Sequence, residues 1–328
     1  MNSRRKLLKS IPALLALPSP GFAQGSDADY PSRAVTIVVP FAAGQSGDIL
    51  ARMLADELTR MWNKPVLVEN KGGAGGAVGS LVVVRAPADG YTLLMGSSGP
   101  ISVAPQMSRN AGYDPRKDLA PLINVAGVPQ MMIVAAGSPF RSVKDVIEAA
   151  RRTPGKLSYG TGGNGSLAHL TMEIFKQRAG IDIAHIPYKG AAPAYTDLLA
   201  GRLDVMFDTP PAALGFVKSG QLRFLAASTA QRAATLPDIP TVAESGLNGF
   251  EVQGWLGMFA PAGLNPALHQ RLNRDLRRVL ETAAIRQRLD TLGMTSLAGG
   301  VEEFRKFVEA DYEKLGAVIR ANNIRSDS

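Results

Sequence analysis

The sequence predicts an α/β protein in which largely parallel sheets carry helices on their faces. Short apolar runs, several of them rich in β-branched residues, alternate with segments whose apolar residues recur at helical spacing. This alternation is typical of layered strand–helix–strand units. The chain has 328 residues, which is enough for two domains with separate cores. We therefore expect two α/β domains after an N-terminal leader.

Residues 1–23 are expected to be a cleaved signal peptide of the twin-arginine type. Two arginines and two lysines precede a short apolar stretch, residues 11–17, in the order typical of a secretion signal. The adjacent Arg4 and Arg5 indicate the twin-arginine route, which exports folded proteins. The apolar stretch is too short to span a bilayer, and small residues follow it up to Ala23. We expect a soluble protein released into the periplasm, with a basic disordered tail as the alternative.

The composition is that of a globular protein, and it excludes several classes of function. Apolar residues make up 45% of the chain, charged residues 20%, and no later apolar run is long enough for a membrane helix. The net charge of +8 falls by four to +4 without the leader's basic residues, and the other lysines and arginines are scattered, so no nucleic-acid partner is expected. The absence of cysteine excludes disulfides, thiol nucleophiles and thiolate metal sites.

The expected elements follow one another in a regular order. Apolar residues at helical spacing from Ile49 to Met61 predict a helix after the first strand. Ser142 followed by Asp145 predicts a capped helix start. A long helical pattern interrupted near Thr282 and a second long pattern close the chain. The predicted strands are residues 35–39, 66–68, 91–95, 131–135, 157–159, 183–186, 205–207 and 224–227, and further helices are predicted over residues 166–178, 266–292 and 301–322.

Two stretches are expected to carry the chain between two lobes. In residues 127–129 and 249–257, turn-forming residues flank apolar strands without an intervening helix. The helices after Pro266 would then return to the first lobe. The predicted lobes are residues 28–127 together with 250–328, and residues 128–249.

Two loops at which a strand passes into a helix are candidates for binding an anion. They span residues 40–48 and 160–166. Their glycines let the backbone approach a ligand closely, and the free N–H groups of a helix's first turn attract anions. Neither loop contains Arg or Lys, so an anion there would be bound by backbone donors, hydroxyls and water. The alternative is that both loops are merely tight turns.

The second loop also permits a different function. Gly160, Gly162 and Gly165 satisfy G-x-G-x-x-G, and Asp182 lies about where a ribose-binding acid could be. This would make the protein a twin-arginine-exported, nucleotide-dependent oxidoreductase. The match lies in mid-chain, however, and the chain has neither a G-x-S-x-G elbow nor H-E-x-x-H. Among the three histidines, we expect His169 to support the loop and His185 to lie in the core.

Several short segments together resemble a known family. They are IVVPFAAG at 37–44, VENK at 68–71, GAGG at 73–76, ADGYTL at 88–93, YDP at 113–115, IPYKG at 186–190, DVMFD at 204–208, LPDIPTVAESG at 236–246 and GW at 254–255. In this order they are similar to the Bug-type periplasmic solute receptors of tripartite tricarboxylate transporters, over nearly the whole mature chain.

The resemblance implies a two-lobed periplasmic-binding-protein (Venus flytrap) architecture, with a mainly parallel sheet flanked by helices in each lobe. Such a receptor closes on a small carboxylate or related solute and presents it to the membrane components of its transporter. It implies no catalysis, no cofactor and no metal, and we expect a monomer. By position, the implied ligand-binding residues are Phe41, Ala42, Gly44, Gln45, Ser46, Asp48, Ser97, Ser98, Thr161, Gly162, Asn164, Gly165, Ser166, His169 and Asp208.

Some of these positions leave alternatives open. Asp208 resembles an acid that in some family members faces an amino group of the ligand, but it could equally cap a helix at Pro210. Tyr188 and Lys189 could touch the ligand or bridge the lobes. Gln45 stands where the family usually has glycine, so its side chain would occupy cleft volume and add an amide donor and acceptor. The preferred solute is then smaller, differently oriented, or an uncharged amide-like or aromatic acid.

Overall fold

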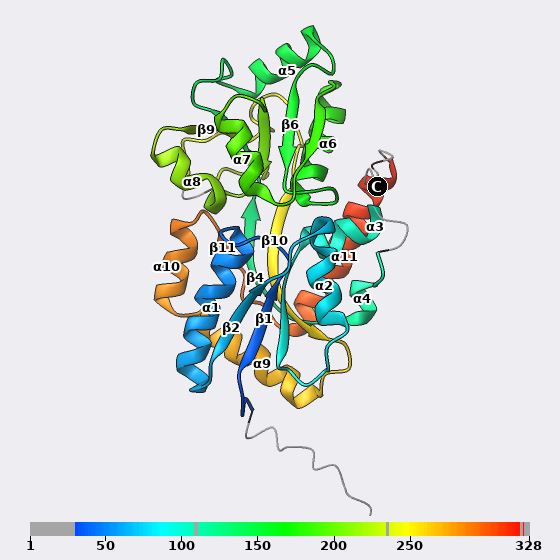
Figure 1. Ribbon diagram of the computed structural model, residues 1–328, viewed down its shortest axis with the longest axis vertical. Helices are drawn as coiled ribbons and strands as arrows, with labels where there is room; N and C mark the ends of the chain where they lie inside the picture. Colours follow the sequence, from blue (N-terminus) through cyan, green and yellow to red (C-terminus); the bar gives the residue numbers. More distant parts are fainter. Residues whose placement is uncertain (1–29, 108–110, 234–235, 322–323, 325–328) are drawn as a thin grey trace, which may run out of the picture. The chain divides into compact units, whose positions relative to one another are not determined.

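The apolar runs and helical patterns form two sheets flanked by helices in a computed structural model of the chain (Figure 1). The structure describes residues 30–107, 111–233, 236–321 and 324. The chain divides into Met1–Tyr30, of which only Tyr30 is described, and Pro31–Ser328, which holds every element below. The predicted signal peptide, residues 1–23, therefore lies outside the described residues. None of the described helices is long and apolar enough to cross a membrane.

The first sheet has six strands in the order β11-β4-β10-β3-β1-β2. Three of them, β1 (Val35–Val39), β2 (Val66–Asn70) and β3 (Thr92–Ser97), are parallel. The longer β10 (Gln253–Pro261) lies between β3 and β4 (Leu119–Pro129) and is antiparallel to both. The short β11 (Thr295–Ser296) completes the edge.

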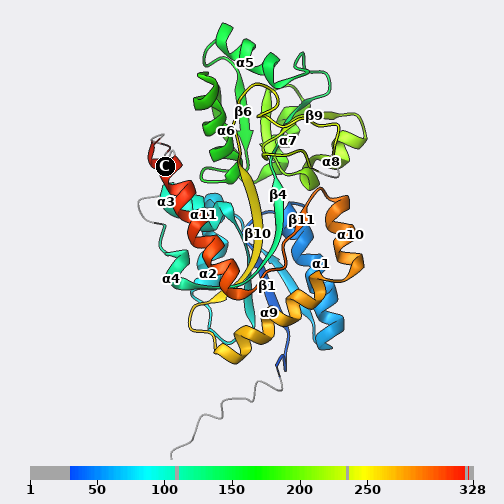
Figure 2. The same cartoon turned by 180° about the vertical axis from the view of Figure 1, so that it is seen from behind.

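Helices cover both faces of this sheet (Figure 2). One face carries α1 (Ser46–Trp62), α9 (Pro266–Leu280) and α10 (Ala283–Thr291). The other carries α2 (Ala77–Val84), α3 (Ala104–Met107) and α11 (Val301–Ala321). Three short turns complete the connections: η2 (Ala74–Gly76), η3 (Gly99–Val103) and α4 (Pro115–Asp118).

The second sheet has five strands in the order β7-β6-β8-β5-β9. Parallel β6, β7 and β8 are joined by helices, while β5 is antiparallel to both β8 and β9. One core packs α5 and α6 on one face, and a second core packs α7 and α8 on the other. The bounds are β5 (Met131–Ala135), α5 (Val143–Arg152), β6 (Ser158–Thr161), α6 (Leu167–Ala179), β7 (Ala184–Pro187), α7 (Ala191–Leu199), β8 (Val205–Asp208), α8 (Pro210–Lys218) and β9 (Leu222–Ala227).

The predicted two-lobed α/β class is confirmed, but the sheets are mixed instead of mainly parallel. The chain enters the second sheet through β5 and returns to the first sheet through β10. Each of these strands is antiparallel to the strands on either side of it. In each sheet, the carboxyl ends of the parallel strands lie at the edge that faces the other sheet. A chain that arrives from the other sheet therefore starts its strand at this edge and runs in the opposite direction to the parallel strands. The chain passes from the first sheet to the second at Gln130 and returns between Ala227 and Gln253. The predicted lobe boundaries stay a prediction.

Local signals placed the predicted elements within about three residues of their observed bounds. Strands β1 and β5 match their predictions, and Ser142 and Asp145 form the expected capping box. The break near Thr282 is also confirmed, because α9 ends at Leu280 and the Thr282 hydroxyl accepts a hydrogen bond from the Ile285 N–H at the start of α10. The last helix ends at Ala321, and its predicted final residue lies outside the described part of the chain.

Gly257 in β10 lets α11 pack close to the first sheet. Phe304 of α11 is fully buried beside Trp255 and Phe259, with ring centroids 5.6 Å and 5.1 Å away. A Cβ at position 257 would overlap the Phe304 ring and lie 3.1 Å from the Ile123 carbonyl oxygen. Because the ring is enclosed, it cannot move aside without disturbing the core.

We therefore expect Gly257→Ala to lower the free energy of unfolding by about 1–3 kcal/mol, the usual cost of overpacking a core. Urea denaturation followed by circular dichroism measures it. Gly215→Ala in α8 is the matched control, because an added Cβ there meets nothing within 4 Å, and it should raise stability by about 1 kcal/mol. A Gly257→Ala variant as stable as the parent would contradict this account of the core.

Candidate functional site

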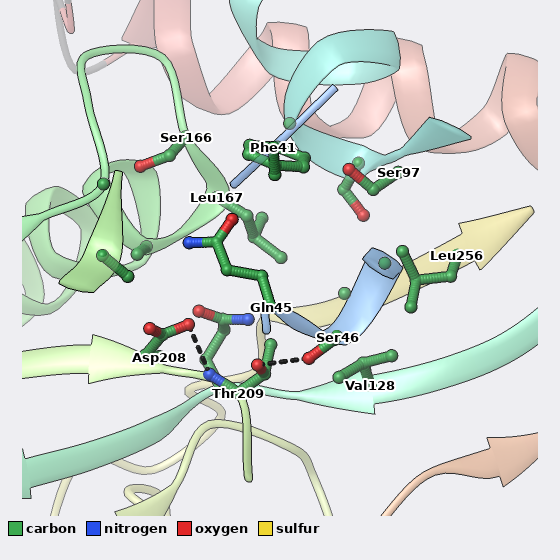
Figure 3. A pocket seen from close by; sticks show the side chains of 18 of the residues that line it. Phe41, Gln45, Ser46, Ser97, Val128, Ser166, Leu167, Asp208, Thr209 and Leu256 are labelled. Carbon is green, nitrogen blue, oxygen red and sulfur yellow. Dashed lines mark hydrogen bonds between the residues drawn. The ribbon is translucent and has the colours of Figure 1, made fainter. Parts of the chain in front are cut away.

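The carboxyl ends of the parallel strands in both sheets meet at a cavity of about 100 Å³ (Figure 3). Ligands of open α/β sheets characteristically bind at such ends. The first sheet's side of the cavity is lined by Phe41, Gln45, Ser46, Gly47, Ser97, Ser98, Gly99, Val128, Gly254, Trp255 and Leu256. The remaining lining residues are Gln130, Gly162, Ser166, Leu167, Ala168, Ala191, Phe207, Asp208 and Thr209.

Helix α1 begins at the cavity without a side-chain cap. Its N-cap residue, Gln45, is extended and makes no capping hydrogen bond to a described residue. The first intrahelical bond runs from the Ile49 N–H to the Gln45 carbonyl. The N–H groups of Ser46 and Gly47 precede that bond, and no partner for them is recorded in the described part of the chain. Both residues line the cavity, so both donors are available to an anion there.

Asp48 stabilises the first loop and does not line the cavity. Its side chain is buried, accepts a hydrogen bond from the Gly44 N–H (2.8 Å) and pairs with Arg52 (2.9 Å). Burial alone would raise the pKa of Asp48, but the bonds from Arg52, Gly44 and Asn70 outweigh it and hold the pKa below its ordinary value. Two other residues of the first loop do not line the cavity either. Gly44 is exposed, and the Ala42 side chain lies close to Gly190, 3.5 Å from the position that a Cβ on Gly190 would have.

Helix α6 brings a second N-terminus to the same cavity. The hydroxyl of its N-cap residue, Ser166, accepts a hydrogen bond from the His169 N–H (3.3 Å). The N–H groups of Leu167 and Ala168 lie in the first turn, and both residues line the cavity. Two helix N-termini, one from each sheet, therefore converge on one space.

Three stacked rings support the second loop from behind. The His185 ring lies 4.6 Å from Tyr159 and 4.2 Å from His169, between centroids. His185 Nε2 is hydrogen-bonded to the Thr161 hydroxyl (2.7 Å), and the Gly165 N–H donates to His169 Nδ1 (3.4 Å). Burial lowers the pKa of His185 to about 3, helped by the charges of neighbouring groups, so this ring is neutral at physiological pH.

Asp208 lies at the end of β8 and lines the cavity. Its Oδ1 accepts a hydrogen bond from the Thr209 N–H (2.7 Å), and its Oδ2 accepts one from the Tyr195 hydroxyl (3.0 Å). Burial raises its pKa to about 6, although the bonds from Thr209 and Tyr195 act in the opposite direction. Thr209, and not Asp208, is the N-cap residue of α8. The Thr209 hydroxyl is hydrogen-bonded to the Ser46 hydroxyl, which links α8 to α1 across the cavity (Figure 3).

The cavity combines apolar walls with neutral donors. The lining residues that the structure describes include no Lys, Arg or His, and Asp208 is the one ionisable carboxyl among them. Ser98 accepts a hydrogen bond from the Trp255 N–H (3.1 Å) and so joins η3 to β10. No group of His, Asp or Glu suited to hold a metal ion occurs among the described residues.

The structure brings some of the predicted residues to the cavity and not others. Lining it are Phe41, Gln45, Ser46, Ser97, Ser98, Gly162, Ser166 and Asp208, whereas Ala42, Gly44, Asp48, Thr161, Asn164, Gly165 and His169 do not. Tyr188 donates to Asp197 (2.6 Å), Lys189 is exposed, and neither lines the cavity. Sequence reasoning missed the other lining residues, which are Gly47, Gly99, Val128, Gln130, Leu167, Ala168, Ala191, Phe207, Thr209, Gly254, Trp255 and Leu256.

The structure does not support the nucleotide alternative. A ribose-binding acid belongs at the carboxyl end of its strand, beside the glycine-rich loop. Asp182 precedes β7, and its carbonyl accepts a hydrogen bond from Gly155, which precedes β6. The acid therefore lies at the other end of the sheet. A Cβ on Gly160 would lie 3.3 Å from that of Ala194, so this glycine serves the packing of α7.

Comparisons with known proteins agree with this two-sheet fold. The family model described as tripartite tricarboxylate transporter family receptor matches residues 50–324. The protein BugT of Bordetella pertussis is 34% identical over 322 residues, which are 98% of each chain. A solved R. palustris protein with adipate has a TM-score of 0.88 and 35% identity, covering 90% of this chain and 99% of that one. The protein MatC from Rhodopseudomonas palustris with bound malate has a TM-score of 0.84 and 28% identity, with 88% and 100% covered.

The ring stack makes a testable prediction about acid stability. The pKa of His185 is about 3 in the folded chain and about 6.5 when unfolded, so between these values only the unfolded chain takes up the proton. Stability from this group is complete above about pH 6.5 and falls as the pH falls, by about 2 kcal/mol at pH 5.

Urea denaturation at pH 7.5 and pH 5 tests this expectation. His185→Gln should lose about 2 kcal/mol less than the parent between the two pH values. Titration of groups outside the ring stack, Asp208 included, occurs in both proteins and cancels in the comparison. His269→Gln, in α9, removes a histidine outside the stack and should behave as the parent does. The prediction is wrong if His185→Gln loses as much stability as the parent.

Proposed function

Because the chain belongs to the tripartite tricarboxylate transporter receptor family, we propose that it is a periplasmic receptor that binds a small carboxylate between its two sheets and delivers it to the membrane components of such a transporter. The family is one of solute-binding receptors, which is not an enzyme class. The predicted leader agrees with export to the periplasm. We expect the receptor to act as a monomer.

The convergence of two helix N-termini on one cavity carries the proposal. Each N-terminus has the effect of roughly half a positive charge, concentrated on its unpaired N–H groups. The donors at Ser46 and Gly47 come from the first sheet's helix, and those at Leu167 and Ala168 come from the second. An anion that accepts from both helices holds the two lobes together, so these contacts favour the closed form.

The chemistry of the related structures fits this arrangement. Adipate and malate, named for the two R. palustris proteins, are both dicarboxylates. A dicarboxylate offers one carboxylate to each helix N-terminus. The apolar walls formed by Val128, Leu167 and Leu256 suit the carbon chain between the two charges.

The size of the cavity favours a compact solute. The cavity of about 100 Å³ is well below the roughly 300–1,000 Å³ of sites for drug-sized ligands. The Gln45 side chain projects into the middle of the space, between Leu167 on one side and Asp208 and Thr209 on the other (Figure 3). We therefore expect a preference for a four-carbon dicarboxylate over a longer one.

Two substitutions at Ser46 test the role of the helix donors. Proline at the first position of a helix is well tolerated, and the extended Gln45 before it is compatible with proline, so Ser46→Pro removes the N–H while α1 stays intact. Ser46→Ala removes only the hydroxyl. We expect Ser46→Pro to bind malate about 10- to 100-fold more weakly than Ser46→Ala, the value of a hydrogen bond to a charged group.

Isothermal titration calorimetry measures this difference. A thermal-shift panel of dicarboxylates, monocarboxylates and amino acids comes first, because a ligand at about 100 times its Kd adds about 2.7 kcal/mol of stability. Equal affinities of Ser46→Pro and Ser46→Ala would show that the α1 donors do not hold the solute. The absence of any carboxylate hit would refute the proposed function as a whole.

Substitution of Gln45 tests the size preference. Gln45→Gly empties the middle of the cavity, so the ratio of malate to adipate affinity should fall about tenfold, the value of one to two methylenes of fit. Gln45→Met keeps the volume and removes the amide. If Gln45→Met also loses the preference for malate, the amide of Gln45 and not its volume selects the solute. If the ratio of affinities is unchanged in Gln45→Gly, Gln45 does not determine specificity.

A further inference from the structure

An ionised Asp208 side chain would repel the anion that the proposed function places in the cavity. An ionised Asp208 would place a second negative charge beside a bound carboxylate. Both of its oxygens already accept hydrogen bonds, from Thr209 and Tyr195, and no cation lies within ion-pair distance of it among the described residues. The first two residues of α8, Pro210 and Pro211, have no N–H, so that helix offers no further donor to offset the charge.

The surroundings of Asp208 on every packed element are neutral. Tyr195 of α7 donates to it, Met131 of β5 is its strand neighbour, and Ser46 reaches it through Thr209. Helix α6, which packs on β8, carries His169 in the ring stack, and its charged Glu173 and Lys176 pair with each other (2.8 Å). Burial is the largest influence on the pKa of Asp208 and raises it to about 6. A carboxylate brought beside this group raises its pKa further, because two like charges in low dielectric disfavour ionisation.

We propose that Asp208 couples solute binding to proton uptake: it binds the solute carboxylate in its protonated form, donating an O–H hydrogen bond to it. This inference rests on the proposed function and specifies how the same cavity accepts an anion. One proton moves from solvent to Asp208 as the solute enters, and it returns to solvent when the solute leaves. A protonated carboxyl adds an O–H donor at the end of β8.

The alternative occupant is a solute with an ammonium group paired to ionised Asp208. The structure favours the protonated carboxyl, because the positive ends of α1 and α6 both face the cavity and repel a cation. The two occupants predict opposite pH dependences, since an ammonium partner requires Asp208 to lose its proton and a carboxylate partner requires it to keep one.

Calorimetric titration of the mature protein with malate at pH 6.5, 7.5 and 8.5 tests the proposal. Asp208 is mostly ionised in the free protein over this range, so the malate affinity should fall up to tenfold for each unit of rising pH. Titrations at pH 7.5 in two buffers with different ionisation enthalpies should show uptake of close to one proton for each malate bound.

Asp208→Asn supplies the matched variant, because the amide keeps the shape and offers a donor without titrating. Its malate affinity should vary less than twofold over the same pH range, with no proton uptake, and at pH 8.5 it should bind at least tenfold more tightly than the parent. Tyr195→Phe removes a donor that stabilises the ionised form, so its loss of affinity should begin at higher pH than in the parent.

The outcomes separate the two claims. Malate binding with a pH-independent affinity and no proton uptake overturns the inference and leaves the proposed function standing. Affinity that rises with pH, in the parent protein and for an amino-acid ligand, overturns it in favour of an ammonium partner. If no dicarboxylate binds, the proposed function fails and this inference fails with it. The buffer comparison needs only the parent protein, so a poorly folded Asp208→Asn variant does not prevent the test.

Discussion

The anion of the proposed function has to be held without a cation, because the described residues that line the cavity include no Lys or Arg, and the rest of the site depends on that constraint. The positive charge comes from helix N-termini, whose effect is confined to the first turn. Two helices must therefore begin at the cavity itself, which requires the parallel strands of both sheets to end there. The antiparallel strands β5 and β10 permit this arrangement, because each starts beside the cavity, where Gln130 and Gly254 line it, and runs away from it.

Because helix donors act only at short range, the loops that precede them have to approach one another closely. A Cβ on Gly75 in η2 would lie 2.6 Å from the Asn164 carbonyl oxygen of the second loop, and its φ of +64° also favours glycine. Gly165 has a φ of +75° and packs against Ala104. The glycine-rich segment 73–76 thus packs against the second loop, a role that its sequence, typical of a sharp turn, does not reveal.

Sequence reasoning succeeded where a signal depends on residues a few positions apart. The capping box at Ser142, the helix break at Thr282 and the two candidate loops are of this kind. It gave no bounds for β4 and β10, since their Pro and Gly residues indicate turns while their pairing joins segments more than a hundred residues apart. The sequence likewise identified the two loops but not which of their side chains face the cavity, because that depends on contacts in the folded chain. Asp48 and His169, for example, accept hydrogen bonds from N–H groups of their own loops.

A receptor has to release its solute as well as hold it, and the two titrating groups near the cavity act in opposite directions. Acid favours the protonated Asp208 but also favours the unfolded chain, which alone protonates His185. The stacked rings support the second loop, whereas the Asp48–Arg52 pair stabilises the first. Protonation of His185 in acid therefore destabilises mainly the second loop. Breaking a buried contact between a carboxylate and a cation costs about 2–5 kcal/mol, much of it for the charge left behind. The N–H donors of the two helix N-termini are neutral groups and leave no such charge, so under the proposed function they lower the barrier to release of the solute.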